Sequence, residues 1–306
     1  MRHKEYISFD WALKRLLRDK ANFDVLEGFL TTLLEKPIKI QRLLESESNK
    51  DRSEVKSNRV DLLAEDEQGE LLLIEVQGES EFSYFHRMIF GASKLVTDYV
   101  ELGSGYENVK KVYSVNIVYF DLGQGTDCVY RGKTEFRGIH DDDVLRLSPF
   151  QQQKFNAEEV SQLFPEYYIL KVNDFNRWSK VPLEQWLYFL ANSDIPEDAD
   201  APGLSAAREK LRFMKMNREE QRVYEHYISE RSILENQMIT AKGEGRNEGL
   251  AEGRAEGRAE GLAEGRAEGR AEANIDTARK LKAMGMLSVQ QIADATGLSI
   301  DEINQL

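Results

Sequence analysis

The chain has 306 residues, enough for two small domains or for one domain with an appendage. Its formal net charge is −13, from 41 Lys and Arg against 54 Asp and Glu, so any contact with nucleic-acid phosphates has to be local. One cysteine, Cys128, excludes an intramolecular disulfide framework and a Cys-based zinc site. No stretch has the apolar length of a membrane span or a secretory signal, and we therefore expect a cytoplasmic protein without membrane segments.

Residues 1–176 alternate helical and strand patterns, which predicts an α/β domain. Two amphipathic helices are expected first, one over residues 10–17 and one from Asn22 to just before Pro37. A third helix is expected over the apolar positions from Phe82 to Val96. Strand patterns follow one another at residues 38–44, 59–65, 70–77, 112–120 and 167–172. The last of these strands is expected to close a sheet that helices flank.

The rest of the chain is predicted to be helical, with one interruption. A helical extension is expected over 177–241, a repeat tether over 242–272 and three short helices over 273–306. The tether repeats Glu-Gly-Arg/Leu-Ala, in which each Gly costs a helix roughly 1 kcal/mol relative to Ala and each Glu lies four residues from the next. This predicts a frayed helix or a flexible tether. A second interpretation is a homo-oligomer in which an identical partner strand stiffens the repeat through Glu and Arg stripes.

The carboxyl-terminal segment has the spacing of a helix-turn-helix unit. Small Ala293 permits close packing, Gly297 suits the turn and Ile303 anchors the second helix. From Leu287 to the end, however, the segment carries no Lys or Arg to meet phosphate. A small helical packing module is therefore favoured over a unit that binds DNA by itself.

The most informative segment runs from Arg59 to Gln77 and is typical of a β-hairpin. Glu67-Gln68-Gly69 suits a three-residue loop with Gly69 in the left-handed conformation. This register places Asp61 directly opposite Glu75, with Gln77 on the same face. A loop of two or four residues would place the two carboxylates on opposite faces, so the interpretation depends on register.

The two carboxylates are expected to need compensation, because the strands around them are apolar on both faces. Strands of this kind lie inside a covered sheet, where two neighbouring charges are costly. A divalent cation would resolve the repulsion, and paired carboxylates suit Mg²⁺. The alternative is that Asp61 and Glu75 lie at strand ends and reach water or a Lys or Arg side chain.

Basic side chains near this segment predict a phosphate site. Residues 2–60 hold 13 Lys or Arg against 10 Asp or Glu, a local balance of +3. Arg87 and Lys94 are spaced two turns apart on the helix after Gln77, where they either contact a nucleic-acid backbone or form a solvated face. Asp10 and Lys14 share one side of the first helix, and as a bare pair they favour a surface ion pair.

At these residues the chain resembles the PD-(D/E)XK nuclease superfamily, and more closely the recombination-promoting nuclease (Rpn) family, whose members are also described as transposases. The residues that carry the resemblance are the opening Phe9-Asp10-Trp-Ala-Leu-Lys14, the Asp61-x13-Glu75-Val-Gln77 core, Phe85-His-Arg87, Pro182-Leu-Glu-Gln-Trp-Leu-Tyr-Phe-Leu190 and the Glu-Gly-rich array. The resemblance implies a restriction-endonuclease-like mixed sheet and a metal-dependent DNA endonuclease.

The resemblance also implies roles for individual residues. Asp61, Glu75 and the backbone carbonyl of Val76 would bind Mg²⁺, with Mn²⁺ as a substitute, and Asp10 would orient a water molecule on the metal. Gln77 takes the place of the lysine in the superfamily's name, so it positions water or phosphate without a charge. The residues expected to contact DNA are Arg87, Lys94, Lys14 and Arg59. Promotion of DNA recombination or processing of mobile elements is the implied cellular role.

Two other classes of function remain open at this point. A non-catalytic adaptor would use the nuclease scaffold and the tail to bind DNA or proteins, and its binding would be indifferent to EDTA. A strand-joining transposase is the third reading, but nothing in the sequence separates joining from hydrolysis.

Overall fold

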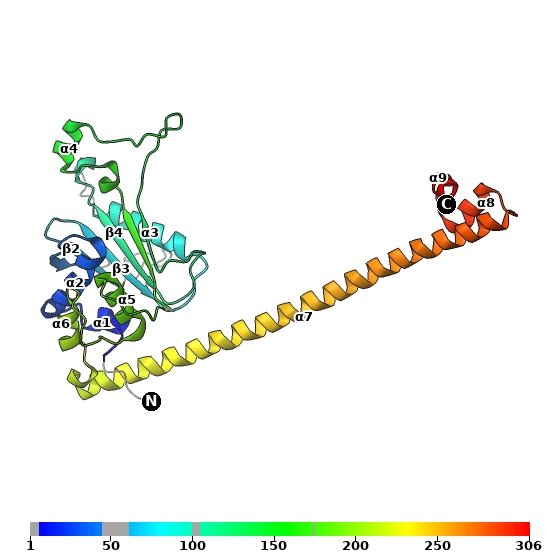
Figure 1. The fold of residues 1–306 in the computed structure, drawn as a ribbon. Helices are drawn as coiled ribbons and strands as arrows, with labels where there is room; N and C mark the ends of the chain where they lie inside the picture. Colours follow the sequence, from blue (N-terminus) through cyan, green and yellow to red (C-terminus); the bar gives the residue numbers. More distant parts are fainter. Residues whose placement is uncertain (1–5, 45–60, 100–104, 174) are drawn as a thin grey trace, which may run out of the picture. The chain divides into compact units, whose positions relative to one another are not determined.

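The computed structural model describes residues 6–44, 61–99, 105–173 and 175–306 (Figure 1). The chain forms two compact units, Met1–Glu225 and His226–Leu306. Within the described ranges, no helix is both long enough and apolar enough to pass through a lipid bilayer.

The first unit is built on a mixed sheet of six strands in the order β1-β2-β3-β4-β6-β5. The strands β1, β2 and β3 are antiparallel neighbours, β3, β4 and β6 run parallel, and β5 is antiparallel to β6. Their bounds are Ile40–Leu43 (β1), Leu62–Asp66 (β2), Leu71–Gln77 (β3), Val112–Val118 (β4), Val129–Gly132 (β5) and Glu166–Lys171 (β6). The predicted mixed sheet with flanking helices is confirmed.

The expectation that the strand at 167–172 closes the sheet is wrong. The short strand β5 pairs with the outer side of β6 and forms the edge instead. Its four residues are half-buried or exposed. A strand of this length with little apolar patterning is hard to recognise in a sequence, because burial on one face is what produces the alternation.

Helices cover the sheet in separate groups. Their bounds are Phe9–Arg15 (α1), Phe23–Leu34 (α2), Tyr84–Asp98 (α3), Pro149–Phe155 (α4), Pro182–Asn192 (α5) and Leu204–Lys210 (α6). Ala92 and Leu95 of α3 pack on Leu63, Leu71 and Leu73 of the hairpin. The helices α1, α2, α5 and α6 gather away from α3 in Figure 1. Aromatic rings join three of them: Phe9 of α1, Phe29 of α2, and Trp186 and Phe189 of α5.

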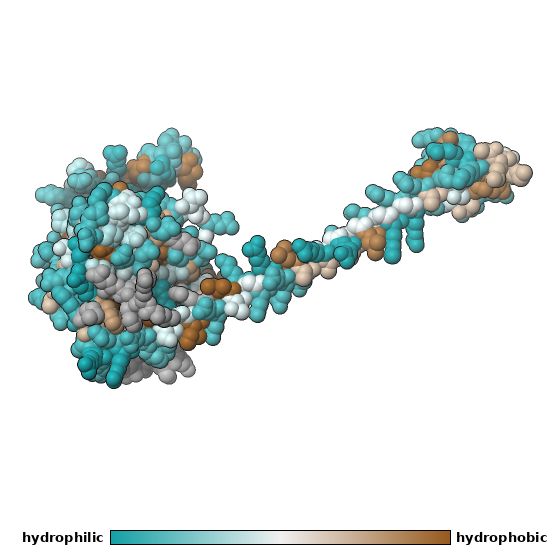
Figure 2. All heavy atoms as spheres, turned by 60° about the horizontal axis from the view of Figure 1, so that its bottom comes forward, coloured by the Kyte–Doolittle hydropathy of each residue, from teal (hydrophilic) through white to brown (hydrophobic). Residues whose placement is uncertain are grey.

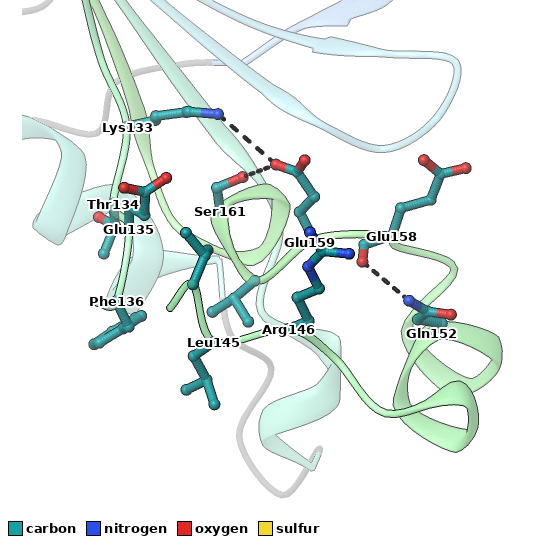
Figure 3. Close-up of a pocket in the computed structure, with 12 residues that line it drawn as sticks. Lys133, Thr134, Glu135, Phe136, Leu145, Arg146, Gln152, Glu158, Glu159 and Ser161 are labelled. Carbon is teal, nitrogen blue, oxygen red and sulfur yellow. Dashed lines mark hydrogen bonds and ion pairs between the residues drawn. The ribbon is translucent and has the colours of Figure 1, made fainter. Parts of the chain in front are cut away.

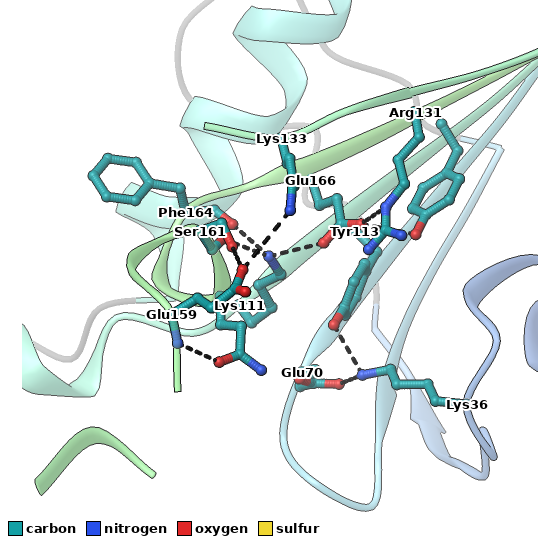
Figure 4. Close-up of polar contacts among 12 residues, drawn as sticks. Lys36, Glu70, Lys111, Tyr113, Arg131, Lys133, Glu159, Ser161, Phe164 and Glu166 are labelled. Atoms are coloured by element: carbon teal, nitrogen blue, oxygen red, sulfur yellow. Dashed lines mark hydrogen bonds and ion pairs between the residues drawn. The ribbon is translucent and has the colours of Figure 1, made fainter. Parts of the chain in front are cut away.

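A polar network ties together the amino-terminal ends of the parallel strands (Figure 4). Lys111 places its Nζ 3.2 Å from Glu166 Oε2, and both side chains are less than 10% exposed. The ring of Tyr113 lies between the ammonium groups of Lys36 and Lys111, at 4.4 and 5.1 Å from its centroid. Buried charges are costly unless they are paired, and here the pairing links β4 to β6. The role of this network is therefore structural.

The repeat forms an α-helix, one of the two states that the sequence predicts, and the fraying of that helix stays a prediction. The helix α7 runs without interruption over Arg218–Met284, a length of 67 residues. Figure 2 shows mostly teal and white atoms along it, with isolated brown patches. Three of every four residues in the repeat are good helix formers (Glu, Ala, and Arg or Leu), and no proline breaks the run. Each glycine still lowers the stability of the helix relative to alanine. An alanine would fit at every one of them, because an added Cβ would meet nothing within 4 Å at any glycine from Gly243 to Gly269.

Replacing Gly253 and Gly257 with Ala is therefore expected to stabilise this part of α7. Each change should contribute about 1 kcal/mol to local helix stability. Amide hydrogen exchange across the repeat of the full chain should slow by roughly tenfold. The opposite change, Ala255→Gly with Ala259→Gly, should speed it. Exchange that stays the same in both variants would mean that the repeat is not helical in solution.

The second unit ends in two further helices, α8 (Val289–Thr296) and α9 (Ile300–Gln305). The helix expected from residue 273 is not separate, since it is the end of α7. Ala278 of α7, Ile292 of α8 and Ile303 of α9 form the core of this unit. Gly297 adopts a left-handed φ of 73° between α8 and α9, as expected of the turn residue.

Candidate metal centre

The hairpin of β2 and β3 has the register that the sequence predicts. Leu62 pairs with Ile74, Leu63 with Leu73 and Ala64 with Leu72, and the loop glycine, Gly69, has a left-handed φ of 79°. Continuing this register by one pair sets Asp61, just before β2, opposite Glu75 of β3. The side chain of Asp61 reaches the backbone of Val76, the residue after Glu75, because Val76 N donates a hydrogen bond of 2.7 Å to Asp61 Oδ2.

Asp61 lies at the end of a strand and is reached by two cations from α1 and the residues after it. Lys14 Nζ is 3.7 Å from Asp61 Oδ1, and Arg18 Nη2 donates a hydrogen bond of 2.6 Å to the backbone oxygen of Asp61. The carboxylate side chain is 22% exposed. Burial raises the pKa of Asp61 above its ordinary value, although the charge of Lys14 and the hydrogen bond from Val76 act the other way.

Glu75 is more deeply buried, with a side chain that is 6% exposed. Its Oε2 is 3.5 Å from Arg87 Nε, whereas its Oε1 is buried and has no hydrogen-bond partner among the described residues. Burial raises the pKa of Glu75 to about 7, against the attraction of Arg87 and with a further upward effect from Asp61. A carboxyl oxygen of this kind is costly, because it has left water without gaining a donor.

Asp10 and Lys14 belong to the same cluster, although their spacing alone favoured a surface ion pair. Lys14 Nζ is 2.7 Å from Asp10 Oδ1, and Asp10 is buried. The charge of Asp10 also raises the pKa of Asp61, behind the effects of burial, Lys14 and Val76. The helix α1 therefore delivers one carboxylate and one ammonium to the end of the hairpin.

The structure brings some of the other predicted residues to this cluster and not others. Arg87 of α3 contacts Glu75 and also Glu81, at 3.2 Å from Nη1 to Oε2. Gln77 is the last residue of β3, on the same face as Glu75 and half-buried. Lys94 lies two turns along α3 from Arg87 and is half-buried. Arg59, the fourth expected DNA contact, lies outside the described residues.

Two polar residues beside Glu75 were missed by the sequence analysis. Asn116 of β4 is the direct parallel partner of Glu75. It accepts a hydrogen bond of 3.3 Å from the hydroxyl group of Tyr84, and both side chains are almost fully buried. The available signal was an amide in a strand of mainly apolar residues, since such a side chain is buried only where it finds partners.

The donor set fits a hard divalent cation that keeps part of its water. Among the described residues there is no group of three or more His, Cys, Asp or Glu side chains arranged to hold a metal. Asp61 and Glu75 offer carboxylate oxygens only, and Glu75 Oε1 is the buried atom that lacks a partner. Mg²⁺ characteristically takes one or two carboxylates together with backbone or water oxygens, and Mn²⁺ accepts similar ligands.

The segment between β5 and β6 forms a cavity (Figure 3). Its volume is about 520 Å³, and it is lined by charged and apolar side chains that include Lys133, Phe136, Arg146 and Glu159. These residues follow β5 or precede β6, so they lie at the amino-terminal end of the parallel strands. Glu75 and Gln77 lie at the opposite end, and none of the predicted site residues lines the cavity.

Comparison with known proteins identifies the family. The model of a family described as PD-(D/E)XK nuclease family transposase matches residues 7–240, a range that contains Asp10, the hairpin and α3. Neither the curated proteins nor the solved structures include one that matches this chain. Since the family match spans well over half of the sequence, the chain belongs to the PD-(D/E)XK nuclease family transposases.

Proposed function

We propose that this protein is a metal-dependent nuclease that hydrolyses phosphodiester bonds in DNA. The proposal is supported by the hairpin register, which continues to set Asp61 opposite Glu75, by the hydrogen bond from Val76 N to Asp61 Oδ2, and by the buried Glu75 Oε1, which has no hydrogen-bond partner among the described residues. Such a pair is destabilising in a purely structural role, because two carboxylates repel each other in a desolvated place. Membership in a family of nucleases supports the same conclusion, and divalent metals are the usual cofactors of these enzymes.

The proposed ligands are Asp61, Glu75 and the backbone carbonyl of Val76. A bound Mg²⁺ or Mn²⁺ would activate water and neutralise charge on the phosphate. The proposed role of Asp10 is to orient the attacking water from α1. Gln77 can hold water or a phosphate oxygen through hydrogen bonds, but its amide cannot accept a proton near neutral pH.

The proposed DNA contacts are Lys14, Arg87 and Lys94. Lys14 and Arg87 form ion pairs with the carboxylates, which supports a role in binding a phosphate that approaches the metal. Lys94 extends the basic side of α3 by two turns. The whole chain has a net charge of −13, which disfavours phosphate binding in general. A local group of cations makes phosphate binding favourable at this site. Arg59 remains a predicted contact.

Cleavage of supercoiled plasmid tests the proposal. We expect nicked or linear DNA with Mg²⁺ or Mn²⁺ and none with EDTA. At limiting metal, cleavage should rise between about pH 6 and pH 8, because Glu75, whose pKa is raised to about 7, must lose its proton to bind a cation. Cleavage that persists in EDTA, or that falls as the pH rises over this range, would reject the proposed chemistry.

One observation favours the adaptor as a second candidate. The ion pairs of Lys14 with Asp61 and of Arg87 with Glu75 partly neutralise the carboxylates without a metal. An adaptor would show no heat of binding with Mg²⁺ or Mn²⁺, and neither ion would raise its melting temperature. A calorimetric titration of the wild type, with Glu75→Ala as the control, separates the two functions.

A further inference from the structure

Lys14 occupies a place between two carboxylates of the candidate centre. Its Nζ is 2.7 Å from Asp10 Oδ1 and 3.7 Å from Asp61 Oδ1. The two carboxylates are mostly buried, with side chains 11% and 22% exposed, whereas the Lys14 side chain is 42% exposed. The ammonium group therefore neutralises buried charge from the solvent side, on a flexible stem that can turn outwards.

Arg87, the other cation of the centre, is held more firmly. Its guanidinium group contacts Glu75 at 3.5 Å and Glu81 at 3.2 Å, and its side chain is 33% exposed. If Arg87 moves away from Glu75, the contact with Glu81 still retains it. Within the described part of the chain, Lys14 forms ion pairs with Asp10 and Asp61 and has no such anchor outside the centre.

A divalent cation on Asp61 would repel an ammonium group at this distance, because like charges a few ångströms apart interact strongly even near a protein surface. The same ammonium group would be attracted to the phosphate of a DNA strand bound at the metal. One flexible charge thus has two alternative partners, the protein's carboxylates and the substrate's phosphate.

We propose that Lys14 is an exchangeable counter-ion that couples metal binding to DNA binding. In the free protein it neutralises Asp10 and Asp61, and in the loaded protein it is transferred to phosphate. Metal binding thereby frees the Lys14 ammonium group to contact DNA. DNA binding, in turn, draws this ammonium group away from the carboxylates, where it competes with the metal. By thermodynamic linkage each ligand then strengthens the other by the same factor. This inference rests on the proposed nuclease function.

Metal affinity in the absence of DNA gives the first test. Calorimetric titration of the full chain with Mn²⁺ at pH 8 should show about fivefold tighter binding for Lys14→Met than for wild type, the size of effect expected from removing one partly exposed ion pair. Lys14→Arg keeps the charge and should bind like wild type. Lys39→Met removes a lysine that pairs with Glu27 at 2.6 Å, outside the centre, and should leave the affinity for Mn²⁺ unchanged. A melting curve confirms that each variant is folded, and Lys14→Gln replaces Lys14→Met if the latter is not.

The coupling between the two ligands gives the second test. The dissociation constant of a DNA duplex is measured with and without Ca²⁺, and a gel afterwards confirms that the DNA is intact. The ratio of the two constants should be several-fold smaller in Lys14→Met than in wild type. Equal or weaker Mn²⁺ binding by Lys14→Met, or an unchanged ratio, would overturn the proposal. If the wild type binds no metal, the proposed nuclease function itself is rejected. If the wild type cleaves DNA but Lys14→Met has the same metal affinity and the same ratio of DNA dissociation constants, only the role of Lys14 is rejected.

Discussion

Asp61→Asn and Glu75→Gln should each lower the rate of metal-dependent DNA cleavage by about 10³-fold or more. Either change removes a negative oxygen ligand while keeping the shape of the side chain. A catalytic metal contributes several kcal/mol to transition-state stabilisation, and each 1.4 kcal/mol corresponds to a factor of ten in rate. The effect should appear at saturating DNA, because the loss lies in the chemistry and not in the contacts of Lys14, Arg87 and Lys94 with phosphate.

Glu65→Gln is the matched control for this prediction. Glu65 is a buried carboxylate of the same hairpin, but its partners are Arg42 at 2.6 Å and Lys110 at 2.7 Å. Its loss is expected to reduce stability and to leave the cleavage rate of the folded protein unchanged. Rates that fall equally in Glu65→Gln and Glu75→Gln would show that the hairpin is merely sensitive to mutation. Rates that survive in both Asp61→Asn and Glu75→Gln would exclude these carboxylates from the reaction.

Glu75→Gln should also stabilise the metal-free protein at alkaline pH. Burial raises the pKa of Glu75 to about 7, so the folded state favours the protonated carboxyl more than the unfolded chain does. The stability associated with this proton is fully present below the ordinary pKa of a glutamate, about 4.5, and is lost as the pH rises through about 7. Above that pH the ionised side chain costs the folded protein up to roughly 3 kcal/mol, which an amide does not.

Unfolding in urea at a series of pH values in EDTA measures this effect. Glu75→Gln and wild type should have equal stability near pH 4, and the variant should be more stable by roughly 3 kcal/mol at pH 8, a difference that already includes the attraction of Arg87 because the pKa of about 7 includes it. Added Mn²⁺ should reverse the order, since only the wild type binds it well. A variant that is less stable than wild type at pH 8 in EDTA would show that Arg87 compensates the ionised Glu75. The structure would then give no reason for a metal at Glu75.

The hairpin shows why part of the candidate site could be predicted from sequence. A three-residue loop with Gly69, together with apolar strands of fixed length, leaves one register in which both faces stay buried. That register places Asp61 opposite Glu75, and the hydrogen bond from Val76 to Asp61 agrees with it. These are interactions between neighbours in sequence, for which local pattern carries the information.

The helix α7 shows where local pattern points in two directions. Its glycines and its Glu–Glu spacing oppose a helix, whereas the helix propensity of the remaining residues favours one. The edge strand β5, by contrast, was missed. Its pairing with β6 is decided by a partner more than thirty residues further along the chain, and the strand itself carries almost no burial pattern.

The sequence by itself determined the alternation of helices and strands, the hairpin register that sets Asp61 opposite Glu75, and the turn at Gly297, because each follows from periodicity or from the backbone preference of one residue, whereas the mixed sheet was implied by the family resemblance. Only the tertiary structure decided which cations lie against the carboxylates and which oxygen of Glu75 is left without a donor. Lys14 and Asp61 are 47 positions apart in the chain, and Asn116 and Glu75 are 41 apart. Contacts over such separations depend on how α1 and β4 pack against the hairpin, which local periodicity does not specify.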